Sequence, residues 1–108
     1  MLPLISIIIS VYNSDKFIVE TLKSILDQEY QNIELIIIDD GSTDNTVPIL
    51  NSYEMNKKIK IFYLPHSGNI GKNLNYGISN SKGEFICICG ADDVWNKDKL
   101  TVQIQFLK

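Results

Sequence analysis

Two pairs of neighbouring acidic residues each follow an apolar run. Asp39 and Asp40 follow one run, and Asp92 and Asp93 follow another; we expect both runs to form buried strands. Adjacent carboxylates repel each other unless a cation or hydrogen-bond donors compensate their charge. A divalent ion such as Mn²⁺ or Mg²⁺, held by one or two carboxylates and phosphate oxygens, is one such compensation. Capping of a following helix is the alternative, so Asp92 and Asp93 are candidate metal ligands or caps.

The turn that begins at Asp39 carries more acid than one helix cap requires. The segment Asp-Gly-Ser-Thr-Asp over residues 40–44 is good turn chemistry by itself. With Asp39, however, three acidic side chains surround this turn. A carboxylate at a strand end can accept a hydrogen bond from a base N–H or a ribose hydroxyl, as in dinucleotide folds. A ligand site and a plain turn both remain open for Asp40.

Two aromatic residues have rival interpretations. Tyr12 could stack on a nucleobase, although packing at a strand end is the commoner role. Trp95 follows the second acidic pair, and we interpret it as a packing anchor rather than a sugar platform.

The loop between residues 66 and 75 is rich in Gly and Asn. Lys72 follows Gly71 there and could contact a phosphate or simply be solvated. The P-loop pattern is absent, because His66 stands at its first glycine position and Asn73 replaces the Ser or Thr. We interpret His66 mainly as a loop residue, with a ligand role as the alternative.

Strand and helix patterns alternate along the chain. Short apolar runs predict strands over residues 4–10, 33–38, 59–64 and 84–89. Helical spacing of apolar residues predicts helices over about 16–28, 44–53 and 72–79 and from about 97 onward. Polar residues 12–15 offer cap chemistry for the first helix. The order predicts an α/β fold with a mostly parallel sheet, in which ligands bind at the carboxyl ends of the strands.

Composition restricts the function classes. The chain has 108 residues and a net charge of −3, which predicts a single domain over residues 1–108 and disfavours nucleic acid as a partner. No apolar run approaches the roughly 20 residues of a membrane span, and no signal peptide is evident. Cys87 and Cys89 are interpreted as buried, reduced thiols. We expect a cytoplasmic protein, or one at the inner membrane face in a longer form.

The last predicted helix has Leu100, Ile104 and Leu107 on one face. With no further element to cover it, this apolar face predicts self-association into a homo-oligomer.

Four segments together resemble the family-2 glycosyltransferases of GT-A fold. They are Ser-Ile-Ile-Ile-Ser-Val-Tyr-Asn at 6–13, Asp-Asp-Gly-Ser-Thr-Asp at 39–44, Gly-Glu-Phe-Ile at 83–86 and Ala-Asp-Asp at 91–93. Residues 22–28 also resemble the first helix of that family. The resemblance implies a GT-A-like (Rossmann-like) fold and a nucleotide-diphosphate sugar as donor, usually a UDP-sugar. It also implies inverting transfer to a hydroxyl of a glycan or lipid-linked acceptor.

The resemblance assigns roles to individual residues. Asp92 and Asp93 would hold Mn²⁺ or Mg²⁺ against the diphosphate. Gly90 stands where many members carry an aspartate, and Ser10 where many carry a proline. The residues implied for nucleotide-sugar binding are Ser10, Val11, Tyr12, Asn13, Asp40, Lys72, Asn75 and Asp92.

Family members place the general base and most acceptor contacts in a further half after the acidic motif. We therefore expect this chain to be truncated before the acceptor half, to contain no catalytic base, and to be inactive or weakly active alone. A non-catalytic nucleotide-binding or assembly module is the alternative function. A dinucleotide oxidoreductase is disfavoured because no G-x-G-x-x-G follows the first strand, and a receiver domain because that strand does not end in an acidic pair.

Overall fold

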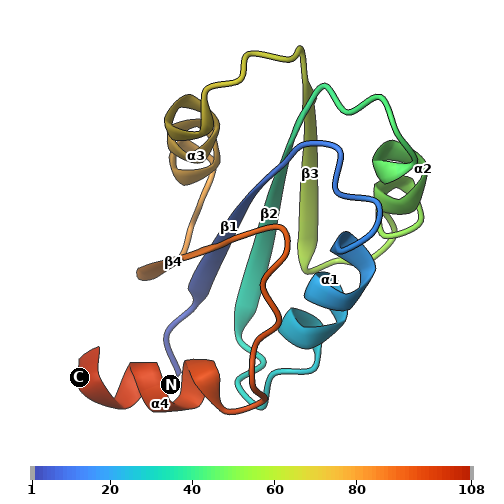
Figure 1. Ribbon diagram of the computed structural model, residues 1–108. Coiled ribbons are helices and arrows are strands. Elements are labelled where there is room, and N and C mark those ends of the chain that lie inside the picture. Colours follow the sequence, from blue (N-terminus) through green and yellow to red (C-terminus); the bar gives the residue numbers. More distant parts are fainter. Residues whose placement is uncertain (1, 108) are drawn as a thin grey trace.

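The computed structural model describes residues 2–107, which form strands and helices in strict alternation (Figure 1). In chain order the elements are β1 (Ile5–Val11), α1 (Ile18–Leu26), β2 (Ile33–Asp40), α2 (Thr46–Asn51), β3 (Ile59–Leu64), α3 (Ile70–Ser79), β4 (Phe85–Cys89) and α4 (Lys99–Leu107). The predicted order of elements is confirmed.

The strands form one sheet in the order β3-β2-β1-β4, and every neighbouring pair is parallel. The mostly parallel α/β fold is therefore confirmed. Strands β1 and β2 are nearly continuous apolar runs because helices cover both faces of the sheet centre. Val11 pairs with Asp39 and Asp40 pairs with Leu64, so the carboxyl ends of β1, β2 and β3 lie side by side.

Two apolar layers hold the sheet. The larger layer joins alternate residues of the strands, such as Ile7 and Ile37, to α1, α2 and α4. The smaller layer joins Ile8, Ile36 and Ile38 on the other face to α3. In Figure 1, α3 lies on one side of the sheet and α1 and α2 on the other.

Helix α3 lies very close to the sheet at Gly77. A β-carbon at Gly77 would lie 2.6 Å from Cγ2 of Ile8, closer than real side chains come. Glycine is therefore required here by the close approach of the helix backbone to β1.

Some element boundaries differ from the prediction. Strand β2 runs two residues further than expected. Asp39 and Asp40 are its last two residues and pair with β3, rather than belonging to the following loop. Helix α1 begins at Ile18, and no side chain caps it. The expected cap chemistry of residues 12–15 is thus wrong, because the side chains of Asn13 and Asp15 bond across to the loop after β2 instead.

The prediction that the fourth strand is buried is wrong. Ile86 and Ile88 are 45% and 49% exposed, because β4 is an edge of the described sheet and α3 packs on β1 and β2. On its other face β4 presents two free cysteines toward the larger layer, and both were expected to be buried. Cys89 is buried and Cys87 partly buried, and burial raises the pKa of Cys89 to about 12.

The expected exposed face of the last helix is also wrong. Leu100 and Ile104 are 1% and 6% exposed and join the larger layer beside Trp95, because α4 crosses beneath the amino ends of the strands (Figure 1). The side chain of Leu107 lies outside the described part of the structure. Trp95 is confirmed as a packing anchor, with its backbone N–H donating to Ser24 Oγ at 3.0 Å.

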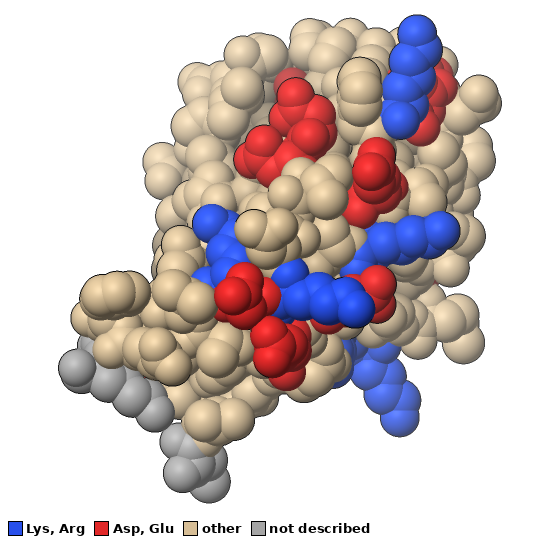
Figure 2. All heavy atoms as spheres, turned by 60° about the horizontal axis from the view of Figure 1, so that its bottom comes forward, with Lys and Arg blue, Asp and Glu red and all other residues tan. Residues whose placement is uncertain are grey.

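The charged surface is mixed in sign. On the face of the described chain drawn in Figure 2, Lys side chains alternate with Asp and Glu rather than forming one basic patch. Across residues 2–107, no helix combines the length and hydrophobicity that crossing a bilayer requires.

Candidate functional site

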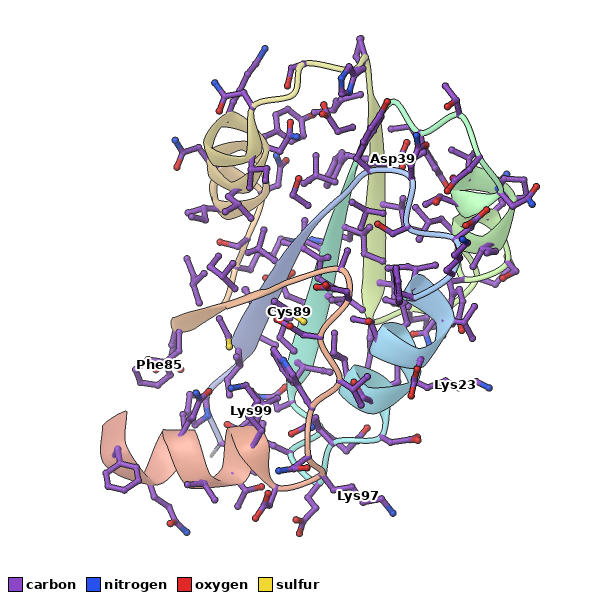
Figure 3. All side chains as sticks on the ribbon, in the orientation of Figure 1. Lys23, Asp39, Phe85, Cys89, Lys97 and Lys99 are labelled. Carbon is purple, nitrogen blue, oxygen red and sulfur yellow. The ribbon has the colours of Figure 1, made fainter. Side chains whose placement is uncertain are left out.

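A cavity of about 420 Å³ opens at the carboxyl ends of the strands. Figure 3 labels Asp39 at this end of β2, with Phe85 at the opposite end of the sheet. The residues that line the cavity are Ser10, Tyr12, Asn13, Ser14, Phe17, Asp40, His66, Gly68, Ile70, Ala91 and Asp92. Five of these were expected from sequence: Ser10, Tyr12, Asn13, Asp40 and Asp92. The last residue of β2 and the loops that follow β1, β3 and β4 therefore meet at one site, as the strand-end rule for parallel sheets predicts.

Asp40 is the most heavily bonded side chain of the cavity. It is 3% exposed. Its Oδ1 accepts from the backbone N–H of Ser67 at 2.9 Å, and its Oδ2 accepts from that of Gly68 at 3.0 Å. Burial alone would raise the pKa of this carboxyl, but these hydrogen bonds, with others from Asn73 and the Ser67 hydroxyl, lower it to about 2. Asp40 is thus a fixed anion that organises the loop after β3.

His66 completes the surroundings of Asp40, although the sequence analysis gave it a ligand role only as the alternative. Its Nδ1 lies 3.1 Å from Oδ2 of Asp40 and 3.0 Å from the Asp40 carbonyl oxygen. Its ring stacks on Tyr12 with centroids 4.3 Å apart and planes at 27°. Its position directly after the third strand was the available signal, since that places it at the ligand-binding edge.

Asn13 ties the loop after β1 to the turn after β2. Its Oδ1 accepts from the backbone N–H of Thr43 at 2.8 Å and of Asp44 at 3.3 Å. Its own N–H donates to Ser42 Oγ at 2.9 Å. Asn13 has a φ of 46°, a left-handed conformation that Asn tolerates better than most side chains.

The same two loops are joined a second time by hydrogen bonds from backbone N–H groups to the carboxylates of Asp15 and Asp44. The Asp15 N–H donates to Oδ2 of Asp44, and the Asn45 N–H donates to Oδ2 of Asp15. Asp44 also accepts from the Thr46 N–H at 2.9 Å. Burial opposes ionisation of Asp44, but the bonds from Thr46 and Asp15 outweigh it and lower its pKa. The carboxylate of Asp39 bonds within the turn that follows it, because both of its oxygens accept hydrogen bonds from Ser42.

The two carboxylates after β4 approach one point beside Gly90. A β-carbon at Gly90 would lie 2.8 Å from Oδ2 of Asp93 and 3.3 Å from Oδ1 of Asp92. Oδ2 of Asp93 also accepts from the Gly90 N–H at 3.0 Å, so Asp93 closes its own turn while Asp92 lines the cavity. Among residues 2–107, no cluster of three His, Cys, Asp or Glu side chains is arranged to hold an ion.

A divalent ion nevertheless fits this pair. Hard oxygen donors suit Mn²⁺ or Mg²⁺, and Mg²⁺ commonly uses one or two carboxylates and completes its shell with substrate phosphates and water. Asp92 and Asp93 would be the protein ligands.

The sequence profile of glycosyl transferase family 2 matches residues 6–108, which include every residue of the cavity and both acidic pairs. The chain belongs to this family. An uncharacterised glycosyltransferase of Haemophilus influenzae is 40% identical over 107 residues, which are 98% of this chain and 43% of that protein.

Solved structures agree with the family. TarS 1-349 of S. aureus, in complex with UDP-GlcNAc, matches with a TM-score of 0.88 and 34% identity over 95% of this chain and 30% of that one. The mannosyltransferase PcManGT of Pyrobaculum calidifontis, in complex with GDP-Man and Mn²⁺, matches with a TM-score of 0.90 and 25% identity. That match covers 97% of this chain and 32% of the mannosyltransferase. The expected GT-A-like fold is confirmed, and the chain spans less than half the length of each of these proteins.

Three residues that were expected to bind the nucleotide sugar in this family-2 glycosyltransferase chain do not line the cavity. The side chain of Val11 is fully buried in the larger apolar layer. Lys72 and Asn75 are exposed on α3, because Asn69 caps that helix by accepting from the Lys72 N–H and so fixes which face meets the sheet.

The buried asparagine of α3 is Asn73 instead. Asn73 is 2% exposed and donates to Ser10 Oγ at 3.3 Å. It shares a helix face with Gly77, four residues on, whereas Asn75 lies about 200° around the helix from Asn73.

Proposed function

We propose that this chain binds the donor of an inverting glycosyltransferase, a nucleotide-diphosphate sugar and specifically a UDP-sugar. The acceptor is a hydroxyl of a glycan or lipid-linked molecule. The observation that carries the proposal is that one cavity joins Tyr12, Asp40 and Asp92. These supply an aromatic face, a fixed carboxylate and a metal ligand, which match the base and the diphosphate of one molecule.

The base end of the donor is assigned to Tyr12 and Asp40. Tyr12 is 45% exposed at the cavity, and a base stacked on its ring would gain roughly 1–3 kcal/mol. Asp40 is an acceptor-only anion at neutral pH, so it selects a base that presents a ring N–H, as uracil and guanine do. The complexes of TarS with UDP-GlcNAc and of PcManGT with GDP-Man support this assignment.

The diphosphate end is assigned to Asp92 and Asp93 with Mn²⁺ or Mg²⁺. When bound, such an ion stabilises negative charge on the leaving nucleotide. The residues of this chain bind and orient the donor: Asp92 at the diphosphate, and Ser10 and Asn13 from the wall of the same cavity. The Mn²⁺ in the PcManGT complex supports the metal.

The general base that deprotonates the acceptor is proposed to lie outside residues 1–108. Asp40 cannot serve, because its pKa of about 2 makes it a weak base and its oxygens already accept several hydrogen bonds. We place the working enzyme in the cytoplasm, where nucleotide sugars would be its donors.

Calorimetric titration of the chain with UDP, with and without Mn²⁺, tests the proposal. We expect binding that Mn²⁺ strengthens, and Asp92→Asn should remove the metal-dependent part while leaving metal-free UDP binding. Asp98→Asn is the matched control, since it makes the same change at an exposed acid that does not line this cavity. A wild-type chain that binds no nucleotide under either condition would overturn the proposal and favour an assembly module.

A further inference from the structure

The imidazole of His66 already makes the two contacts assigned above to the base. It stacks on Tyr12 at 4.3 Å between centroids, and its Nδ1 lies 3.1 Å from Oδ2 of Asp40. We propose that His66 is an internal competitor for the nucleobase, which occupies the base position in the free protein and sets nucleotide affinity by having to leave. This inference rests on the proposed function.

The chemistry of the contact resembles that of a base. Both neighbours of Nδ1 are acceptors, namely the Asp40 carboxylate and the Asp40 carbonyl oxygen. The Asp40 carboxyl is ionised, since its pKa is about 2. Nδ1 must therefore carry the hydrogen. His66 thus presents a planar aromatic ring with a ring N–H directed at Asp40, as uracil or guanine would.

Two rings cannot occupy this position together. The Tyr12 and His66 rings are in stacking contact, which leaves no gap for a third ring between them. A base that stacks on this face of Tyr12 and bonds to Asp40 must displace the imidazole.

The surroundings let the imidazole leave without dismantling the loop. The backbone of His66 is fixed, because Gly41 lies against it and the next two N–H groups bond to Asp40. The His66 side chain is 50% exposed, so it can rotate toward solvent. After rotation, Asp40 still accepts from Ser67 and Gly68, and Oδ2 regains a free lone pair for the base.

Competition of this kind lowers the apparent affinity by the fraction of molecules whose site is open. His66→Ala removes the competitor while leaving the Asp40 carboxylate and the Tyr12 ring in place. We expect this variant to tighten UDP binding about tenfold. That is the change produced if the form with His66 stacked on Tyr12 is about ten times more populated than the form with His66 rotated away. Because the side chain is half exposed, the variant should keep the fold, which circular dichroism checks.

Calorimetric titration of wild type and His66→Ala with UDP is the first test, with Met55→Ala, a change at a 92% exposed side chain, as control. Tighter binding by His66→Ala alone supports the inference. Equal or weaker binding by His66→Ala overturns it and leaves the proposed function standing, with His66 then part of the platform. If no variant binds UDP, the proposed function fails and this inference fails with it.

A second test needs no variant at position 66. His66 is the only histidine of the chain, so its ring resonances can be followed by NMR without ambiguity. The Tyr12 ring should shift them in the free protein, and either saturating UDP or Tyr12→Leu should move them toward values of a solvated imidazole. Ring resonances that stay unchanged when UDP saturates the protein would overturn the inference.

Discussion

A β-carbon at Gly41 would lie 2.6 Å from the backbone nitrogen of His66. The turn after β2 and the loop after β3 therefore touch backbone to backbone. Gly41 also has a φ of 72°, which side chains rarely adopt. This contact fixes the start of the loop that surrounds Asp40, so one glycine outside the cavity determines where His66 lies.

Gly41→Ala should therefore destabilise the chain by about 2 kcal/mol or more, from strain at positive φ and from the clash with His66. Urea unfolding measures the change. Gly71→Ala is the control, because that glycine lies in α3 with its nearest neighbour 3.5 Å from the β-carbon position. The control should be neutral or stabilising by up to about 1 kcal/mol. Equal losses for both variants would contradict the structural role of Gly41.

Asp40→Asn should weaken the loop after β3, because an amide group cannot replace both acceptor oxygens. We expect a loss of about 2 kcal/mol at neutral pH. The folded pKa of Asp40 is about 2, below its ordinary value of 3.8. Its stabilising effect is therefore complete above about pH 4 and is lost as pH falls toward about 2.

Thermal melts from about pH 6 down to about pH 2 test this dependence. The stability difference between wild type and Asp40→Asn should be constant above about pH 4 and shrink below it. A difference that does not change with pH would mean that the ionised form of Asp40 is not what holds the loop.

Asn13 allows its backbone conformation to be separated from its hydrogen bonds. Asn13→Gly removes the bonds to Thr43 and Asp44 but suits the φ of 46°. Asn13→Ala removes the same bonds and adds strain. We expect losses of about 1 kcal/mol for Gly and about 2 kcal/mol for Ala in chemical unfolding. Identical losses would show that the left-handed conformation carries no cost.

The exposed face of β4 should govern solubility more than stability. Ile86 and Ile88 are half-exposed and belong to neither apolar layer, so replacing both with Thr should change the free energy of unfolding by about 1 kcal/mol or less. Concentration-dependent light scattering should fall, because an apolar edge strand favours association. Val94→Thr, at a 58% exposed side chain outside the sheet, is the control. Equal scattering by all variants would contradict a role for β4.

The sheet and most of the site could be predicted because they depend on local patterns. Apolar runs of strand length followed by polar residues fix both the strands and their carboxyl ends, and parallel connections then bring Tyr12, Asp40 and Asp92 together. Family resemblance added the roles of these residues.

The features that were not predicted depend on contacts between distant segments, which the periodicity of the sequence does not specify. His66 reaches Asp40 because a loop folds back over a strand end 26 residues earlier. Whether Asn73 or Asn75 faces the sheet depends on the residue at which α3 begins, which the Asn69 cap sets. The burial of Leu100 and Ile104 depends on where α4 passes beneath the sheet, and helical spacing specifies a face without its partner.

Gly77 shows how a missing side chain can act as a spacer. The helix backbone rests directly on Ile8, and one turn earlier the same face carries Asn73, whose amide reaches Ser10 and Asp40. Any side chain at position 77 would lift α3 from β1 and withdraw that amide by a comparable distance. The position of the amide that holds Ser10 and Asp40 is therefore set by how closely α3 packs on β1, at a contact outside the cavity.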